Sequence, residues 1–150
     1  MTHRLTRLVA TLGLAAVAFG PAIVVAQGDP IAERQEIMKG VGDATRTGVQ
    51  MVRGERPFDL DAARNAFVVY VDASERMPDL FPDGTETGGD TEASPAIWED
   101  KERFVVLFTE WGDAAAAGLE QTTDATTFQA AFGTATQSCR TCHTDFRLDN

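Results

Sequence analysis

The chain has 150 residues, of which 43% are hydrophobic and 24% are charged, so its length and composition are those of one globular domain. Its 23 Asp and Glu residues outnumber its 13 Lys and Arg residues, and the formal net charge of −10 argues against a nucleic-acid-binding protein, which needs a basic face. The 2 cysteines are too few for a disulfide scaffold or for a Cys-rich zinc site.

Residues 1–26 are typical of a signal peptide. Two arginines precede an apolar stretch over 8–25, and small residues lead to a cleavage site after Ala26. A membrane anchor is the alternative, but the break at Gly20–Pro21 and the small residues before the site favour cleavage. We therefore expect an exported, periplasmic protein that is not inserted in a membrane after cleavage and whose single domain spans residues 27–150.

Four segments of the remaining chain show the three-and-four spacing of apolar residues that indicates amphipathic helices. They run from about Pro30 to Arg53, from about Asp59 to Met77, from Ser94 to Gly118, and from about Thr123 through Phe146. Cap residues, prolines and glycines set these predicted ends. No segment shows a convincing alternating strand pattern. Because two of the connections are short, the sequence predicts an all-α, up-down-up-down four-helix bundle.

Each predicted helix has a stripe of residues expected to face the core. The stripes are Met38, Val41, Thr45, Gly48 or Val49, and Val52; Leu60, Ala63, Phe67, Tyr70 or Val71, Ser74 and Met77; Ile97, Lys101 by its methylene stem, Phe104, Phe108, Trp111 and Ala115; and Phe128, Phe132, Ala135, Cys139, Cys142 and Phe146. The long connection from Pro78 to Ser94 contains three glycines. It is either a loose surface excursion or a loop packed along the bundle by Leu80 and Phe81.

The last predicted helix carries Cys139-Arg140-Thr141-Cys142-His143, the spacing that attaches a c-type haem. Two thiols three residues apart lie about one helical turn apart and can form thioethers with the two vinyl groups of a porphyrin. His143 follows on the same turn and can be the proximal iron ligand. These are the only cysteines in the chain, and His143 is the only histidine after residue 26.

Three other interpretations of the two cysteines are weaker. A thioredoxin-like dithiol needs a strand before the motif, whereas the pattern here is helical. A disulfide three residues apart within a helix closes a short, strained loop and stabilises little. A site in which the two thiols ligate a metal directly is the third alternative.

The whole chain after residue 26 resembles the class II cytochromes c, the family of cytochromes c prime and c-556. The resemblance rests on Arg34-Gln35, Gly54-Glu55-Arg56-Pro57-Phe58-Asp59, Ser94-Pro95-Ala96-Ile97-Trp98, and Cys139 to Arg147, which stand in the family's order. It implies a four-helix bundle with one haem c, attached near the C-terminal end through thioether links at Cys139 and Cys142.

The family divides on the group that faces the iron opposite the proximal histidine. The resemblance implies an apolar or aromatic blocker in cytochromes c prime and a methionine ligand in the c-556 type. In an up-down-up-down bundle Met38 lies level with His143, whereas Met51 lies some 20 Å farther along the helix. Met77 is near the haem level but adjoins Pro78. We therefore expect Met38 as the distal ligand, with an unligated Met38 beside the haem as the alternative.

Two arginines are weaker candidates for contact with the haem. Arg147 follows His143 by four residues, and the resemblance places it beside the proximal face; an exposed charge favoured by the helix dipole is the alternative. The resemblance also suggests that Arg34 pairs with a haem propionate, although a solvated helix residue fits the pattern nearly as well. Phe81, Trp98, Phe132 and Phe146 are expected in the core or the haem-pocket wall.

The function expected from this sequence is one-electron transfer in the periplasm with redox partner proteins, because methionine ligation stabilises ferrous iron. The acidic surface suggests a partner with a basic patch. The alternative is a five-coordinate protein that binds nitric oxide or carbon monoxide, and a third hypothesis is an exported bundle without haem. No acid–base pair or nucleophile is evident, so we do not expect an enzyme. The resemblance also allows a homodimer through the first two helices.

Overall fold

The computed structural model describes residues 28–148 of the chain. Within them lie four long helices, α1 (Pro30–Val52), α2 (Leu60–Arg76), α4 (Lys101–Gln121) and α5 (Ala125–Phe146), and two short ones, η1 (Met77–Leu80) and α3 (Ala96–Glu99). The predicted signal peptide and its cleavage site lie outside this part. None of the helices within residues 28–148 has the length and apolar character needed to cross a membrane.

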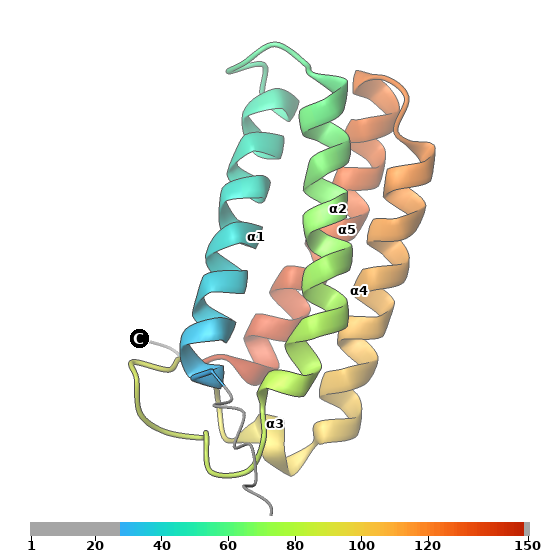
Figure 1. Cartoon of the computed structure of the whole chain (residues 1–150). Coiled ribbons are helices and arrows are strands. Elements are labelled where there is room, and N and C mark those ends of the chain that lie inside the picture. Colours follow the sequence, from blue (N-terminus) through green and yellow to red (C-terminus); the bar gives the residue numbers. More distant parts are fainter. Residues whose placement is uncertain (1–27, 149–150) are drawn as a thin grey trace, which may run out of the picture.

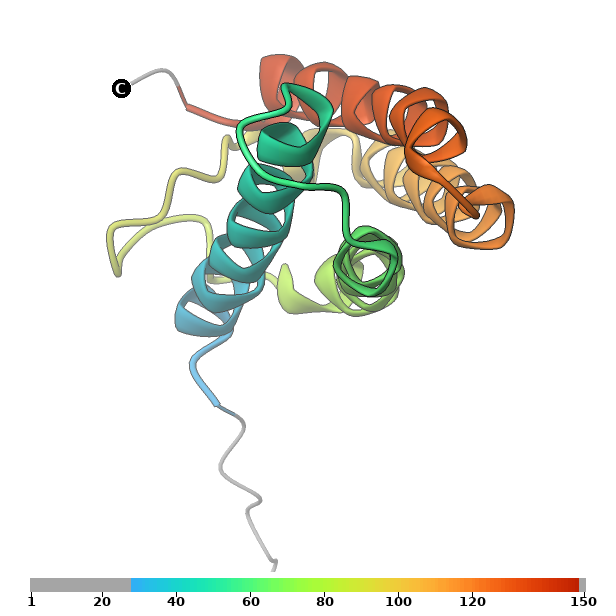
Figure 2. The same ribbon diagram turned by 90° about the horizontal axis from the view of Figure 1, so that it is seen from above.

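The long helices alternate in direction, which confirms the predicted up-down-up-down bundle. In Figure 1, α1 and α4 run upward and α2 and α5 run downward, so the C-terminal end of α5 lies level with the N-terminal part of α1. Seen from above, α4 and α5 lie alongside one another, whereas α1 runs obliquely past α2 (Figure 2). The N-terminal part of α1 therefore diverges from α5.

The ends of α1 and α2 follow the capping residues in the sequence. The Asp29 carboxylate accepts hydrogen bonds from the amides of Ile31 and Ala32 in α1, and the Asp59 carboxylate accepts one from the amide of Ala62 in α2. Gly54, at φ +70°, turns the chain between them. Two stripe positions at these ends are wrong: Val52 and Leu60 are exposed, because each is a terminal residue of its helix and reaches past the packed region.

The third predicted helix differs from the structure at both ends. Its first turn is the separate helix α3, and the chain breaks at Asp100, whose carboxylate then caps α4 by accepting from the Arg103 amide. At the other end α4 continues past Gly118 to Gln121. Gly118 is not a helix stop: it packs against Phe67 of α2, where a Cβ would overlap the aromatic ring. This glycine serves close helix packing.

Aromatic side chains fill the centre of the bundle, as the stripes of the second, third and fourth predicted helices indicate. Phe67 and Phe128 meet edge to face at 5.9 Å, and Phe104 and Phe146 meet at 5.4 Å. Tyr70 lies between Trp111 and Phe132. Edge-to-face pairs of this kind add to the burial of apolar area. Among the four aromatic residues that the sequence left between core and pocket wall, Phe81, Phe132 and Phe146 are core, and Trp98 packs partly buried against it.

The connection between α2 and α4 is packed against the lower end of the bundle, which decides between the two sequence interpretations. Phe81 is buried, and the amide of Ser94 donates to the carbonyl of Phe146 at 3.0 Å. Ala93 forms an isolated β-bridge with Arg147. Residues 77–95 therefore close the end of the bundle where α1 begins and α5 ends.

Candidate functional site

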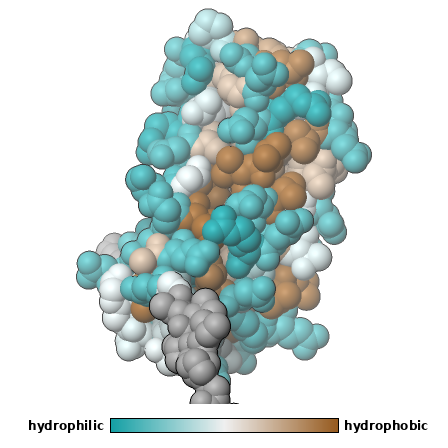
Figure 3. Space-filling model, in the orientation of Figure 1, coloured by the Kyte–Doolittle hydropathy of each residue, from teal (hydrophilic) through white to brown (hydrophobic). Residues whose placement is uncertain are grey.

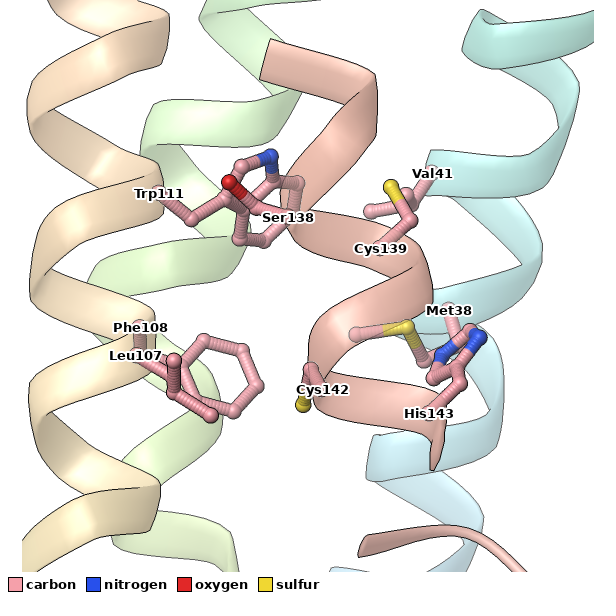
Figure 4. A pocket seen from close by; sticks show the side chains of 9 residues that line it. All are labelled: Met38, Val41, Leu107, Phe108, Trp111, Ser138, Cys139, Cys142 and His143. Atoms are coloured by element: carbon pink, nitrogen blue, oxygen red, sulfur yellow. The ribbon is translucent and has the colours of Figure 1, made fainter. Parts of the chain in front are cut away.

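One cavity lies between α1, α4 and α5 and has a volume of about 400 Å³, part of which opens to solvent. Its lining is shown in Figure 4 and consists of Met38, Val41, Leu107, Phe108, Trp111, Ser138, Cys139, Cys142 and His143. The walls are apolar apart from Ser138, the indole N–H of Trp111 and the imidazole of His143. The cavity thus joins the predicted attachment motif to Met38, residues that lie about 100 positions apart in the chain.

The two cysteines belong to successive turns of α5 and are both free thiols. Cys139 lies on the side of α1 and Val41, and Cys142 lies on the side of α4 (Figure 4). Burial raises the pKa of both thiols, that of Cys142 to about 11 with further contributions from Cys139 and Asp145. In the folded chain they are therefore neutral at physiological pH. Two free thiols on one helix, three residues apart, fit two thioether links, and they form no disulfide.

His143 is the third group of the motif at this cavity. Burial lowers the pKa of its imidazole, Arg147 lowers it further, and Glu92 opposes the shift. The neutral imidazole that these contributions favour is the form that binds iron. His143 thus presents a ligand nitrogen without the need to lose a proton near neutral pH.

Met38 approaches the same cavity from α1. It is half-buried and lies three residues before Val41, on the same helix face. The other two methionines that the sequence offered do not line the cavity. Met51 is packed in the core near the far end of α1, and Met77 is buried in η1. Met38 is therefore the methionine that the fold brings to the motif.

Arg34 lies one turn before Met38 on the same face of α1 and does not line the cavity. Its side chain is buried, at 5% exposure, and stacks on the Phe81 ring at 4.4 Å. Nη2 donates to the carbonyl of Thr85 at 2.9 Å, whereas Nε and Nη1 are buried without a hydrogen-bond partner in the described chain. Burial lowers its pKa. Unpaired N–H groups on a buried cation are costly unless an anion meets them, so the solvated alternative is wrong.

Arg147 is placed differently from the sequence argument. Helix α5 ends at Phe146, and Arg147 has an extended backbone at φ −116° and ψ 141°, so it does not share a helical face with His143. Its guanidinium forms an ion pair with Glu92, with Nη2 and Oε2 2.6 Å apart. It nevertheless lies close enough to lower the pKa of His143.

Several lining residues were not singled out as site residues by the sequence. Phe108 and Trp111 were expected only as core, Leu107 lies outside the predicted stripe, and Ser138 adjoins the motif without belonging to it. Trp111 is 6% exposed, and its indole N–H has no hydrogen-bond partner among residues 28–148. Their position along the helix could have identified them. Because α4 and α5 are antiparallel neighbours, residues 107, 108 and 111 of α4 lie level with residues 138–142 of α5.

This set of residues fits a haem. Two thiols one turn apart, a neutral imidazole and an apolar slot are present, and Arg34 offers buried donors to a carboxylate one turn from Met38. Within residues 28–148 no group of three or more His, Cys, Asp and Glu side chains could hold a metal ion by itself.

Comparisons with known proteins agree with this chemistry. A sequence model of the family described as cytochrome C′ matches residues 29–147. A cytochrome c′ of Rhodopseudomonas palustris is 40% identical over 87% of this chain and 90% of its own length. A cytochrome c-556 of Agrobacterium fabrum is 34% identical over 79% of this chain and 80% of its own. The solved structure of a cytochrome c′ from Rhodopseudomonas palustris superposes with a TM-score of 0.80 at 39% identity, covering 83% of this chain and 99% of that one.

Proposed function

The chain belongs to the cytochrome c′ family, and on this premise we propose that it is a periplasmic one-electron carrier whose haem iron is bound by His143 and Met38. The observation that carries the proposal is the meeting of Met38 and His143 at one cavity, from helices at opposite ends of the chain. Its cofactor is covalently bound haem c, whose attachment Cys139 and Cys142 fit. When bound, the haem supplies an iron that exchanges one electron between its ferric and ferrous states.

The residues of this chain hold the group and set its surroundings. Cys139 and Cys142 fix it to α5, and His143 gives a nitrogen ligand from the same turn. Met38 gives a thioether sulfur, a soft ligand that favours the ferrous state and raises the potential. His143 from α5 and Met38 from α1 would give the iron the same protein ligands in its ferric and ferrous states, which would suit electron transfer. The proposal is electron carriage, and it assigns no enzymatic step.

The walls and the two arginines complete the arrangement. Phe108 and Trp111, both buried, exclude water from the inner side of the cavity. Arg34 pairs with a haem carboxylate through its two unpartnered nitrogens. Arg147 places a positive charge near His143 while Glu92 holds the guanidinium in place.

The second candidate function is that of a five-coordinate haem protein that binds nitric oxide or carbon monoxide. The relative that is 40% identical to this chain is named cytochrome c′, which favours this second candidate. The relative that is 34% identical is named cytochrome c-556, which favours the first. Met38 would then pack in the cavity as an apolar side chain and would not bind the iron. The two candidates differ in one observable, the occupancy of the sixth coordination position.

Absorption spectra of the haem-loaded protein, ferric and ferrous, with and without carbon monoxide, separate the candidates. Methionine ligation gives a low-spin spectrum with a sulfur-to-iron band in the red and no shift with carbon monoxide. M38L then removes that band, and the matched control M51L, in the same helix but away from the cavity, keeps it. A high-spin ferrous spectrum that shifts with carbon monoxide in the unmodified protein overturns Met38 ligation and assigns gas binding.

We also propose export through cleavage after Ala26 and a redox partner with a basic patch, since the chain is acidic. A second copy of the chain is a further proposed partner. Figure 3 shows an apolar band on the face formed by α1 and α2. A groove between the two helices is lined by Ile37, Gly40, Val69 and Ala73 together with the charged Glu33, Glu36, Asp72 and Arg76. Sedimentation of the holoprotein over a dilution series tests whether this face pairs in solution.

A further inference from the structure

Two cations on different helices pack around one phenylalanine at the lower end of the bundle. The Arg34 guanidinium of α1 lies 4.4 Å from the centre of the Phe81 ring, and the Lys101 ammonium of α4 lies 5.3 Å from it. Lys101 is also 5.3 Å from the Phe104 ring. In the described part of the chain neither cation forms an ion pair with a carboxylate. Desolvated cations over aromatic rings are stabilised by the ring faces, and carboxylates farther away, Asp29 and Glu86 for Arg34 and Asp79 and Asp83 for Lys101, offset only part of the cost of burial.

Lys101 fixes the segment that carries Phe81. Its Nζ donates to the carbonyls of Pro78 and Phe81, both at 3.2 Å, which bracket the end of η1. The Phe81 ring is held in turn by Phe104 at 4.7 Å and by Trp98 at 5.8 Å. A lysine is the residue suited to this position, because its compact head has three donors and its stem can line apolar surface.

Arg34 depends on that segment for both of its contacts. Its guanidinium stacks on Phe81, and Nη2 donates to the carbonyl of Thr85 four residues further on. These contacts leave Nε and Nη1 as the two free donors. The orientation of these donors is therefore set by the 78–85 segment, and Lys101 anchors the start of that segment.

We propose that Lys101 is a positioning residue for Arg34: it holds Phe81 so that Nε and Nη1 of Arg34 meet a haem carboxylate. The proposal rests on the proposed function, in which Arg34 pairs with that carboxylate. Lys101 acts through Phe81 and does not itself touch the carboxylate. The sequence predicted only that its methylene stem packs in the core, whereas the positioning of Phe81 depends on its ammonium group.

The test is a double-mutant cycle on the reduction potential of the holoprotein, with R34L, K101M and the double variant. Ferric haem carries one more positive charge than ferrous haem, so an uncompensated carboxylate favours the ferric state and lowers the potential. We expect R34L and K101M each to lower it. We expect the K101M shift to be smaller in the R34L background, because the part transmitted through Arg34 is then already lost.

Three further variants assign the effect. K101R keeps a charge and donors for the two carbonyls, and we expect it to lower the potential less than K101M does. K39M removes an equal charge from an exposed site on α1, and we expect little change. F81L keeps the charges and backbone anchors but removes the ring, and we expect a fall like that of K101M. This variant tests the proposal even if K101M does not fold.

The outcomes separate the positioning role from its premise. If K101M lowers the potential equally with and without Arg34, Lys101 acts only through its own charge and the positioning role is overturned. If F81L leaves the potential unchanged, the ring does not transmit the effect. If R34L itself leaves the potential unchanged, Arg34 does not pair with the carboxylate, and it is the proposed function of Arg34 that fails.

Discussion

At the scale of single residues, the inner wall behind the cavity depends on one hydroxyl. Tyr70 has no exposed surface, and its hydroxyl is 2.7 Å from Oγ1 of Thr45, which in turn donates to the carbonyl of Val41. The ring packs beside Trp111 at 5.3 Å. A buried hydroxyl costs stability unless it is hydrogen-bonded, so Thr45 is the residue that makes a tyrosine tolerable there.

This environment predicts alkaline destabilisation. Burial raises the pKa of Tyr70 to about 12, against the opposing effect of its hydrogen bond with Thr45, while an unfolded tyrosine titrates near 10. The stability due to the neutral phenol is therefore complete below pH 10 and is lost as the pH rises from 10 to 12, by about 3 kcal/mol at most. Urea unfolding of wild type and Y70F at several alkaline pH values measures it. Parallel curves for the two proteins would contradict the prediction.

At the scale of elements, the sequence predicts which helices exist better than where they end. Helix existence follows from apolar periodicity, which is local, and all four long helices were predicted. Gly118 shows why predictions of helix ends fail. A glycine can end a helix or allow close packing of two helices, and here only the presence of Phe67 on α2 decides between the two roles. The break at Asp100 likewise depends on how residues 77–95 close the bundle, a contact between distant segments.

Helix α1 contains three glycines whose surroundings predict opposite effects of alanine. Gly40 and Gly42 have open space around an added Cβ, so G40A and G42A should each stabilise the protein by about 1 kcal/mol through helix propensity. At Gly48 a Cβ would overlap the Phe132 ring, and G48A should destabilise by about 1–3 kcal/mol. Chemical denaturation of the three variants measures this. If G40A destabilised the protein, the added Cβ would be meeting atoms that fill the α1–α2 groove in solution, for example those of a second copy of the chain.

At the scale of the molecule, some residues of the candidate site can be predicted from the sequence, and others are brought together only by the fold. The motif on α5 is contiguous, so the sequence alone gives the two thiols and the histidine that a c-type haem needs. The level of Met38 follows from the alternating helix directions, which the short connections predict. The Arg34 environment does not follow from any local pattern. It needs Phe81, Thr85 and Lys101, which come from a connection that has no periodicity to interpret.

The charge of the whole molecule predicts how it meets redox reagents. With a formal net charge of −10, the chain attracts cations over distances of the order of the screening length, about 10 Å at 0.1 M salt. Oxidation of the ferrous holoprotein by a cationic cobalt complex should therefore slow as salt is added, and oxidation by ferricyanide should accelerate. Stopped-flow rates at several ionic strengths measure both slopes, and slopes of the same sign would exclude electrostatic steering.

Two surface carboxylates distinguish a local field from the total charge. Glu36 is exposed on α1, two residues before Met38, whereas Glu120 is exposed on α4 nine residues beyond Trp111, which is about 13 Å along the helix. E36Q and E120Q remove the same charge. If docking occurs beside the cavity, E36Q weakens the salt dependence of the cationic reaction more than E120Q does, because screening confines each charge to its own neighbourhood. Equal effects would place the attraction in the net charge alone, with no preferred face.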